Sequence, residues 1–347
     1  MKAIVIREFG GPDVLQWEEV PTPIPGPDEA LVRVHAVSVN RTLDLQVRQD
    51  GGNYGTVLPL VLGNDPSGVV VALGDGVEQR LLNRAVAVFG GVRCGVCESC
   101  RMGQPTQCSR PLMLGVHCWG GYAEYLRIPA RNCIPMPDGL SFPEATLIAR
   151  HFPLAFGEAS LASLKAGDRV LVMGAAGGLG SCLVQVARSC GAHVIAGAGA
   201  DERLQAALSL GAHVGINYRR DDLEQEVMRL TQGRGVDVVF ENIGDPTLWP
   251  AAFNSLARGG RLVTAGAHGG GFVTLDVKRL YQRRLHVMSG LGAERREHLE
   301  RALQLAAAGE VRVLIDQVMP LRDAAAAHRL VATNASVGKI VLDPTLE

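Results

Sequence analysis

A glycine-rich turn between a short apolar run and a helical pattern constrains this chain more than any other feature. Gly174, Gly177 and Gly180 follow directly on the apolar run 170–173, and a helical pattern continues to residue 189. In such a turn the backbone can approach a pyrophosphate, and the free amides at the start of the helix bind its charge. The turn therefore predicts a nucleotide site. Its expected residues are Gly174, Ala176, Gly177, Gly178, Leu179 and Gly180.

The chain beyond Pro143 repeats the order of strand, glycine turn and helix. The expected strands are 169–173, 193–196, 236–240 and 260–264, and the expected helices are 180–189 and 201–210. Alternation of this kind specifies a doubly wound parallel sheet. Asn242 and Gly244 follow one of these strands and Gly266 follows the next, so we expect them near the nucleotide.

The end of the second strand predicts which dinucleotide binds. Sites selective for NAD usually place an acidic residue there, about twenty residues after the turn, whereas this chain has small residues at 196–200. They leave room for a 2′-phosphate, which Arg203 or Tyr218 could bind, so we expect NADP(H) to be preferred over NAD(H). The alternative for Arg203 is an ordinary solvated helix residue.

The first part of the chain has a different pattern. Short β-rich runs at 31–34, 68–72 and 85–89 alternate with Pro and Gly clusters, which indicates a barrel-like β domain. With 347 residues, two domains are expected. Helical periodicity returns at 295–308 and 323–331, and the closing strand 338–342 is expected to fold back onto the first domain.

Four cysteines lie within fifteen residues of the β-rich part. Cys94, Cys97, Cys100 and Cys108 follow the pattern C-x2-C-x2-C-x7-C. One loop with this spacing can wrap four thiolates around a tetrahedral Zn2+, which leaves no open coordination position. We therefore expect one structural zinc ion, and we interpret the nearby His117 as structural.

Charge and hydropathy exclude several classes of partner. The net charge is −1, and the 34 basic residues are dispersed, which disfavours binding to nucleic acid or anionic lipid. The uncharged run 170–187 contains four glycines and a glutamine, so it fits a buried strand, turn and helix better than a membrane span. No signal-peptide pattern is present at the N-terminus, and a cytoplasmic location is expected.

Together, these motifs resemble the medium-chain dehydrogenase/reductase superfamily over the whole chain, and its quinone oxidoreductase branch in particular. The resemblance implies an N-terminal GroES-like β-barrel domain with a zinc lobe, 1–155, completed by 291–347, and a Rossmann domain, 156–290. The stretches that carry it are Gly63-Asn-Asp-Pro-Ser-Gly-Val-Val70, Gly120-Gly-Tyr-Ala-Glu-Tyr125, 175–180, Gly215-Ile-Asn-Tyr218 and Gly338-Lys-Ile-Val-Leu342.

The resemblance also separates this chain from the zinc alcohol dehydrogenases. A catalytic zinc needs a cysteine, a histidine and a further Cys or acidic ligand around an open position. Those ligands fall on Asn40, on the pair Asn64-Asp65 and near Arg150. Asn and Arg cannot replace thiolate or imidazole, so no catalytic zinc is expected.

The residues implied to act near the nicotinamide lie mainly in the first domain. The resemblance places Asn40, Asp44 and Tyr54 there, with Asp65 at the vacated zinc position. A phenol can hydrogen-bond a developing oxyanion without ionising, so Tyr54 is the preferred donor. The alternatives are a loop tyrosine that shields an apolar edge and, for Asn40, a local turn cap.

Arg150 and His151 stand out in the otherwise small and apolar stretch 145–156. Arg150 could bind an anionic substrate, although pairing with Asp44 or Asp65 is slightly favoured. His151 is either a proton donor or structural. Leu154 replaces a family-like threonine, so the nicotinamide surroundings are expected to differ from the usual pattern.

The leading hypothesis is an NADPH-dependent reductase of a small-molecule quinone or α,β-unsaturated carbonyl compound, because such acceptors need no Lewis acid. The rivals are a zinc-dependent alcohol dehydrogenase and a catalytically silent NADPH-binding sensor or scaffold. A redox or nucleic-acid zinc module ranks last. In the resemblance, 285–290 is an edge strand that pairs across a two-fold axis, so a homodimer is expected.

Overall fold

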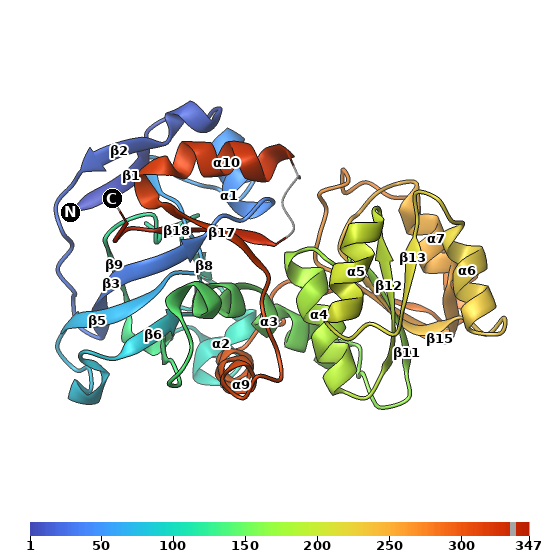
Figure 1. Ribbon diagram of the computed structural model, residues 1–347. Coiled ribbons are helices and arrows are strands. Elements are labelled where there is room, and N and C mark those ends of the chain that lie inside the picture. Colours follow the sequence, from blue (N-terminus) through green and yellow to red (C-terminus); the bar gives the residue numbers. More distant parts are fainter. Residues whose placement is uncertain (334–337, 347) are drawn as a thin grey trace. The chain divides into compact units, whose positions relative to one another are not determined.

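The computed structural model describes residues 1–333 and 338–346. The chain forms two compact units (Figure 1). Unit 1 comprises Met1–Arg150 and Leu299–Glu347, and unit 2 comprises His151–His298. The divisions fall inside two helices, α3 (Phe142–Leu161) and α9 (Arg296–Ala307), whereas the sequence placed the boundaries at 155/156 and 290/291. Helical periodicity runs unbroken through both divisions, so the sequence pattern does not mark them.

Unit 2 is built on a six-stranded parallel sheet with the order β13-β12-β11-β14-β15-β16. Its strands are β11 (Arg169–Met173), β12 (His193–Ala198), β13 (Val214–Asn217), β14 (Val236–Glu241), β15 (Leu256–Thr264) and β16 (His286–Ser289). Its helices are α4 (Gly178–Ser189), α5 (Asp201–Ser209), α6 (Leu223–Leu230), α7 (Leu248–Asn254) and α8 (Val277–Gln282). The predicted doubly wound sheet is thus confirmed, with the strand order of a dinucleotide-binding fold.

The central strands of this sheet are buried on both faces. β11 and β14 are almost wholly buried, as expected for parallel strands that helices cover on both sides (Figure 1). Their carboxyl ends carry Gly174 and Asn242, so these two residues lie at one edge of the sheet.

Unit 1 is mainly antiparallel. Its strands are β1 (Lys2–Ile6), β2 (Gln16–Glu19), β3 (Glu29–Ser38), β4 (Leu60–Val61), β5 (Ser67–Leu73), β6 (Ala85–Val88), β7 (Gly91–Val92), β8 (Leu112–Met113), β9 (Tyr125–Pro129), β10 (Cys133–Pro135), β17 (Ile315–Pro320) and β18 (Lys339–Asp343). They form a three-stranded sheet (β2-β1-β4), a seven-stranded sheet centred on β3 and a two-stranded ribbon (β7-β8).

The end of the chain completes the larger sheet. β18 pairs antiparallel with β3, with Val341 opposite Ser38 and Leu342 opposite Val37. The red strand β18 therefore lies beside the blue strand β3 in Figure 1. This confirms the expected return of the tail onto the first domain, and it brings residues about 300 positions apart into one sheet.

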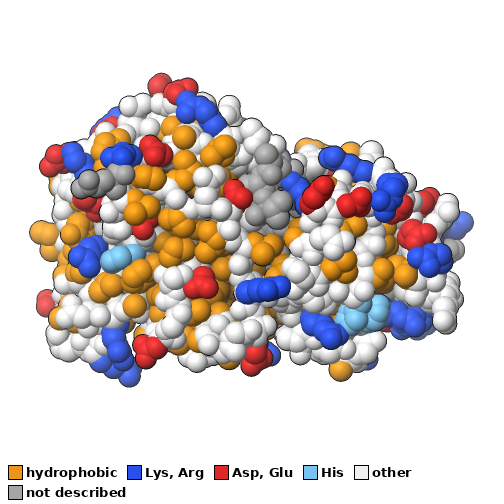
Figure 2. Space-filling model, in the orientation of Figure 1, with side chains coloured by type: hydrophobic (Ala, Val, Ile, Leu, Met, Phe, Trp, Pro, Cys, Tyr) orange, Lys and Arg blue, Asp and Glu red, His pale blue; other side chains and the backbone are white. Residues whose placement is uncertain are grey.

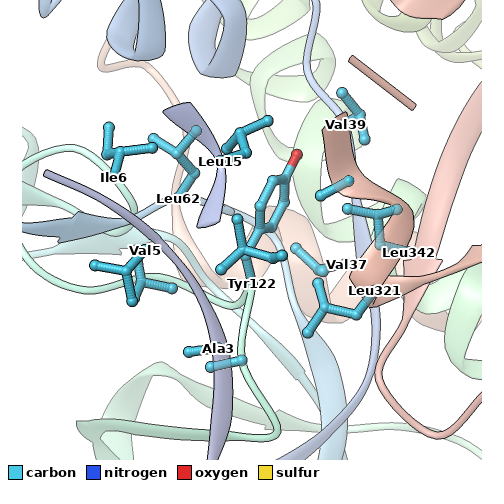
Figure 3. Close-up of a cluster of buried hydrophobic side chains, with 14 of the residues drawn as sticks. Ala3, Val5, Ile6, Leu15, Val37, Val39, Leu62, Tyr122, Leu321 and Leu342 are labelled. Carbon is cyan, nitrogen blue, oxygen red and sulfur yellow. The ribbon is translucent and has the colours of Figure 1, made fainter. Parts of the chain in front are cut away.

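Three further helices belong to unit 1: α1 (Leu43–Asp50), α2 (Glu98–Arg101) and α10 (Ala324–Thr333). A buried apolar cluster packs against α1, α10 and the small sheet, and Figure 3 shows the ring of Tyr122 surrounded by Val37, Leu62, Leu321 and their neighbours. The Tyr122 side chain is fully buried, so its hydroxyl group requires partners within the protein.

Basic and acidic side chains are interspersed on the face drawn in Figure 2. Among the helices of the described ranges, none has both the length and the apolar character needed to cross a membrane.

Candidate active site and zinc lobe

The glycine turn of unit 2 has the geometry of a pyrophosphate cradle. Gly174 follows β11 with a φ of 65°, a conformation that favours glycine, and the N–H of Gly177 donates to its carbonyl oxygen at 2.8 Å. A Cβ on Gly180 would lie 2.1 Å from that same oxygen, so only glycine lets α4 pack against the turn. No side chain caps the start of α4 at Gly177. Its first amides are therefore oriented for an anion.

His151 packs on this turn. A Cβ on Gly178 would lie 2.8 Å from Cε1 of His151, so the imidazole lies directly over the backbone of the first helical residue. Ala176 and Leu179 are partly exposed beside it, whereas Gly180 is buried. Leu154, on α3, is buried.

Two arginines and a tyrosine gather at the end of β12. A Cβ on Gly199 would lie 3.0 Å from the Tyr218 ring and 3.2 Å from Nε of Arg219. Burial raises the pKa of Tyr218, while the positive charges of Arg203 and Arg219 lower it, which shows that both guanidinium groups lie near the phenol. The sequence indicated Arg203 and Tyr218 but not Arg219, whose sequence signal is its place directly after Tyr218.

The residues after β14 and β15 close the same edge of the sheet. Nδ2 of Asn242 donates to the Met173 carbonyl oxygen at 3.3 Å, while its Oδ1 is buried and has no hydrogen-bond partner among the described residues. An orphaned acceptor beside the glycine turn fits a ligand that donates a hydrogen bond. Gly266 has a packing role, because a Cβ there would lie 2.1 Å from the Asn242 carbonyl oxygen. Gly244 binds the buried Glu241 carboxylate through its N–H at 2.9 Å.

In unit 1, Asp65 and Asn40 form a buried polar cluster at the end of β3. Oδ1 of Asp65 accepts the Ser38 N–H at 3.0 Å, and its Oδ2 accepts the Ser38 hydroxyl at 2.6 Å and Nδ2 of Asn40 at 3.2 Å. Nζ of Lys339 donates to Oδ1 of Asn40 at 2.8 Å. Asn64 instead donates to the Leu114 carbonyl oxygen at 2.8 Å. These side chains therefore bind one another and the backbone.

Asp44 lies next to this cluster. Its Oδ2 accepts the Asn40 N–H at 2.7 Å and the Tyr122 hydroxyl at 3.4 Å, and its Oδ1 is buried without a hydrogen-bond partner in the described part of the chain. Burial, followed by the negative charge of Asp65, raises the pKa of Asp44 to about 7. Such a group can change its protonation near neutral pH, which is a property of functional carboxyl groups.

The remaining sequence candidates occupy separate places in unit 1. Tyr54 is half-buried against the apolar cluster of Figure 3, and its backbone oxygen accepts Nε2 of His117 at 2.9 Å. His117 accepts the Met113 N–H at 3.0 Å through Nδ1, so its role is structural, as expected.

Arg150 lowers the pKa of Asp44 through its charge. It forms no ion pair with Asp44 or Asp65 in the described structure, so the favoured pairing was wrong.

The four cysteines form a compact lobe around β7, α2 and β8. Their sulphur atoms all lie within 4.8 Å of one another, with Cys94–Cys108 at 3.5 Å and Cys97–Cys108 at 4.0 Å. Four sulphurs about 2.3 Å from one zinc ion are separated by about 3.8 Å, so the lobe fits Zn2+. Within residues 1–333 and 338–346, this is the only group of three or more potential metal ligands this close together.

Backbone N–H groups prepare two of these thiols as ligands. The amides of Ser109 and Cys100 lower the pKa of Cys97 to about 5, and those of Val96 and Cys97 lower the pKa of Cys94. Burial and the neighbouring sulphurs raise the pKa of Cys100 to about 12. A bound dication would relieve this crowding of sulphur atoms.

Comparison with known families matches both units. The profile described as "Alcohol dehydrogenase GroES-like domain" matches residues 26–138, and that described as "Zinc-binding dehydrogenase" matches residues 178–308. The NAD-dependent alcohol dehydrogenase of Sulfolobus acidocaldarius is 32% identical over 331 residues, which is 93% of this chain and 94% of that protein. The chain belongs to the medium-chain dehydrogenase/reductase superfamily.

Other members of this superfamily carry different names. The 2-haloacrylate reductase of a Burkholderia species is 33% identical over 99% of this chain and 98% of its own length, and the quinone oxidoreductase of Sus scrofa is 28% identical over 99% and 97%. A crystal structure of an NAD-dependent alcohol dehydrogenase has 38% identity and a TM-score of 0.91, and covers 99% of each chain. The chain is therefore an oxidoreductase of this superfamily. Relatives named NAD-dependent do not support the expected preference for NADP(H).

Several residues of the unit 1 cluster were not found from the sequence. They are Ser38, Tyr122, His328 and Lys339, which hold Asp65, Asp44 and Asn40 in place. Tyr122 and Lys339 lie within motifs that carry the family resemblance, Gly120–Tyr125 and Gly338–Leu342. That position is the only sequence signal that could have singled them out.

Proposed function

We propose that this protein is an NAD(P)H-dependent reductase that transfers hydride to a quinone or to the β-carbon of an α,β-unsaturated carbonyl compound, without a catalytic zinc. One observation carries the proposal. Where the resembled alcohol dehydrogenases hold catalytic zinc, Asn40 and Asp65 hydrogen-bond each other, Ser38 and Lys339. Asparagine and ammonium are hydrogen-bond donors, so this cluster suits an acceptor that is already electrophilic.

The bound nicotinamide would supply the hydride, and the protein would supply orientation and hydrogen bonds. Hydride addition to the β-carbon of an enone moves the C=C electron pair toward the carbonyl, which leaves an enolate oxygen. A proton from water then adds to the α-carbon. In this proposal Asn40 and Tyr54 donate hydrogen bonds to the developing oxyanion. Asp44 and His151 take part in protonation, and Arg150 interacts with the charge of the substrate.

The names of two relatives support this class of acceptor. A 2-haloacrylate contains a C=C bond conjugated with a carboxylate, and a quinone is a conjugated dicarbonyl compound. The alternative is a zinc-dependent alcohol dehydrogenase, which the relatives with that name support. A protein that binds the dinucleotide without turnover is the third outcome of the test.

The cofactor preference belongs to the same proposal. Arg203, Tyr218 and Arg219 surround Gly199 at the end of β12, where the second ribose of a dinucleotide binds in this fold. We therefore propose NADPH as the preferred cofactor.

For assembly, β16 pairs only with β15 within the described residues and exposes Val287, so we propose a homodimer formed along this edge strand.

The deciding experiment combines metal analysis with turnover. The purified protein is analysed for zinc and then assayed for oxidation of NADPH and NADH with a quinone, an enone, 2-chloroacrylate and an aldehyde. One zinc per chain with turnover of a conjugated acceptor supports the proposal. Two zincs per chain with aldehyde-only activity would establish the alcohol dehydrogenase instead, and tight NADPH binding without turnover would establish the silent protein.

Two cysteine variants test the zinc assignment separately. We expect Cys97→Ser to lose the zinc, because three thiolates cannot close the tetrahedral site. Cys190→Ser lies outside the lobe and should keep one zinc per chain.

A further inference from the structure

Lys339 reaches the centre of the unit 1 polar cluster from the last strand. Its Nζ lies 2.8 Å from the Val39 carbonyl oxygen and 2.8 Å from Oδ1 of Asn40. The pairing of β18 with β3 fixes this position, because the Val39 N–H also donates to the Ile340 carbonyl oxygen at 3.0 Å. The lysine is thus held by two acceptors at the point where β3 ends.

Chemistry determines how the Asn40 amide is turned. An ammonium group can only donate hydrogen bonds and a carboxylate can only accept them. Oδ1 must therefore face Lys339, and Nδ2 must face Oδ2 of Asp65, at 3.2 Å. Only 3% of Asn40 and 1% of Asp65 are exposed, so water cannot replace either partner readily.

This arrangement leaves one N–H group of the Asn40 amide without an acceptor among the described residues. Nδ2 of asparagine carries two hydrogens, and Asp65 takes one of them. No other described residue accepts the second hydrogen. Asp65 is itself fixed by the N–H and hydroxyl groups of Ser38, so the amide plane is held at both ends.

We infer that Lys339 is a positioning residue that aims the second Nδ2–H of Asn40 at the carbonyl oxygen of the acceptor. The positive charge of Lys339 at the amide oxygen draws electron density from the nitrogen and so strengthens its N–H groups as donors, because hydrogen bonds in series strengthen one another, while Asp65 fixes the amide plane. The donor then becomes most effective as negative charge develops on the substrate oxygen. This role rests on the proposed reductase function.

The test compares Lys339→Met, Lys339→Arg, Asn40→Ala and the double variant Asn40→Ala/Lys339→Met, each checked for an unchanged thermal midpoint. With an acceptor that the wild-type protein reduces, we expect Lys339→Met to lower kcat about 100-fold, the size typical of losing one oxyanion donor. The NADPH dissociation constant, measured by fluorescence, should change less than twofold. Lys339→Arg keeps the charge and should recover part of kcat.

The double variant separates positioning from an independent role. If Lys339 acts through Asn40, its loss in the Asn40→Ala background should lower kcat less than twofold. Multiplying losses, or a weakened NADPH affinity with kcat unchanged, would overturn the inference and leave the reductase function standing. A wild-type protein that reduces no acceptor would overturn both. If Lys339→Met does not fold, Lys339→Gln decides, because it keeps a donor but removes the charge.

Discussion

The hydroxyl oxygen of Tyr122 lies 3.1 Å from Nε2 of His328, although 206 residues separate the two in the chain. Nη1 of Arg48 lies 3.2 Å from Nδ1 of His328 and can only donate, so the imidazole proton is on Nε2. Burial, together with the charge of Arg48, lowers the pKa of His328 to about 3. His328 is therefore neutral at physiological pH and donates to Tyr122, which in turn donates to Asp44.

Tyr122→Phe should destabilise the protein by about 1–3 kcal/mol, because buried hydrogen-bonding groups of His328 and Asp44 lose their partner. Urea unfolding followed by fluorescence measures the change. Tyr125→Phe is the control, since the Tyr125 hydroxyl makes no hydrogen bond to another described residue, and it should be close to neutral. Equal midpoints for the two variants would show that the chain of hydrogen bonds contributes nothing.

Glu158 should make stability fall as the pH rises. It is fully buried in unit 2, neither carboxyl oxygen has a hydrogen-bond partner in the described structure, and burial raises its pKa from 4.5 to about 8. The folded state therefore holds a proton that the unfolded state releases above pH 4.5, so the stabilising contribution is complete below pH 4.5 and is lost up to pH 8. The loss is on the order of 4 kcal/mol.

Glu158→Met removes this ionisation at similar side-chain volume. Its stability relative to the wild-type protein should increase between pH 4.5 and 8, as measured by urea unfolding at several pH values. Glu8→Gln, at an exposed position, should leave the pH profile unchanged. A wild-type and a Glu158→Met profile that run parallel would show that Glu158 is not protonated in the folded state.

Variants at two glycines of the turn can separate the effect on helix packing from the effect on cofactor binding. Gly180→Ala places a Cβ 2.1 Å from the Gly174 carbonyl oxygen and should lower both the thermal midpoint and the affinity for NADPH. Gly177→Ala meets that oxygen at 3.1 Å with an ordinary φ of −75° and should weaken NADPH binding with a smaller loss of stability. Calorimetry and fluorescence titration measure the two effects. If Gly177→Ala binds NADPH normally, the phosphates do not approach this residue.

Arg219→Ala and Arg203→Ala test the cofactor preference. If these side chains bind a 2′-phosphate, each variant should raise KM for NADPH about tenfold or more and leave KM for NADH nearly unchanged, because charge-assisted hydrogen bonds to phosphate are strong. Arg229→Ala is the control, since Arg229 is paired with Glu226 on the surface of α6. A wild-type protein with a lower KM for NADH would refute the preference.

The sequence predicted the features that depend on local patterns. The turn at Gly174–Gly180 was recognisable because close packing of a helix on the preceding strand requires glycine at fixed spacing. Four cysteines in one loop were recognisable for a similar reason, since one short segment supplies the whole ligand set. The same holds for the strand after Gly338, whose apolar run marks it as β structure.

The polar cluster of unit 1 was only half predicted. Asn40 and Asp65 came from the resemblance, but Lys339 and His328 lie in the last two elements of unit 1, and nothing in their local pattern links them to residues 280–300 positions away. The sequence did not indicate Arg219, for a different reason. It lies in an arginine pair after β13, and only the structure shows that Arg220 pairs with Asp201 while Arg219 lies over Gly199.

The pairing of β18 with β3 also sets the order in which the chain can mature during synthesis. Unit 2 is encoded by one continuous segment and can close its sheet, with the glycine turn, while the last strand is still being translated. Unit 1 must wait for that strand, which brings Lys339 to Asn40. A chain cut before residue 338 should therefore still hold the dinucleotide, but it would lack the lysine that orients the amide at the end of β3.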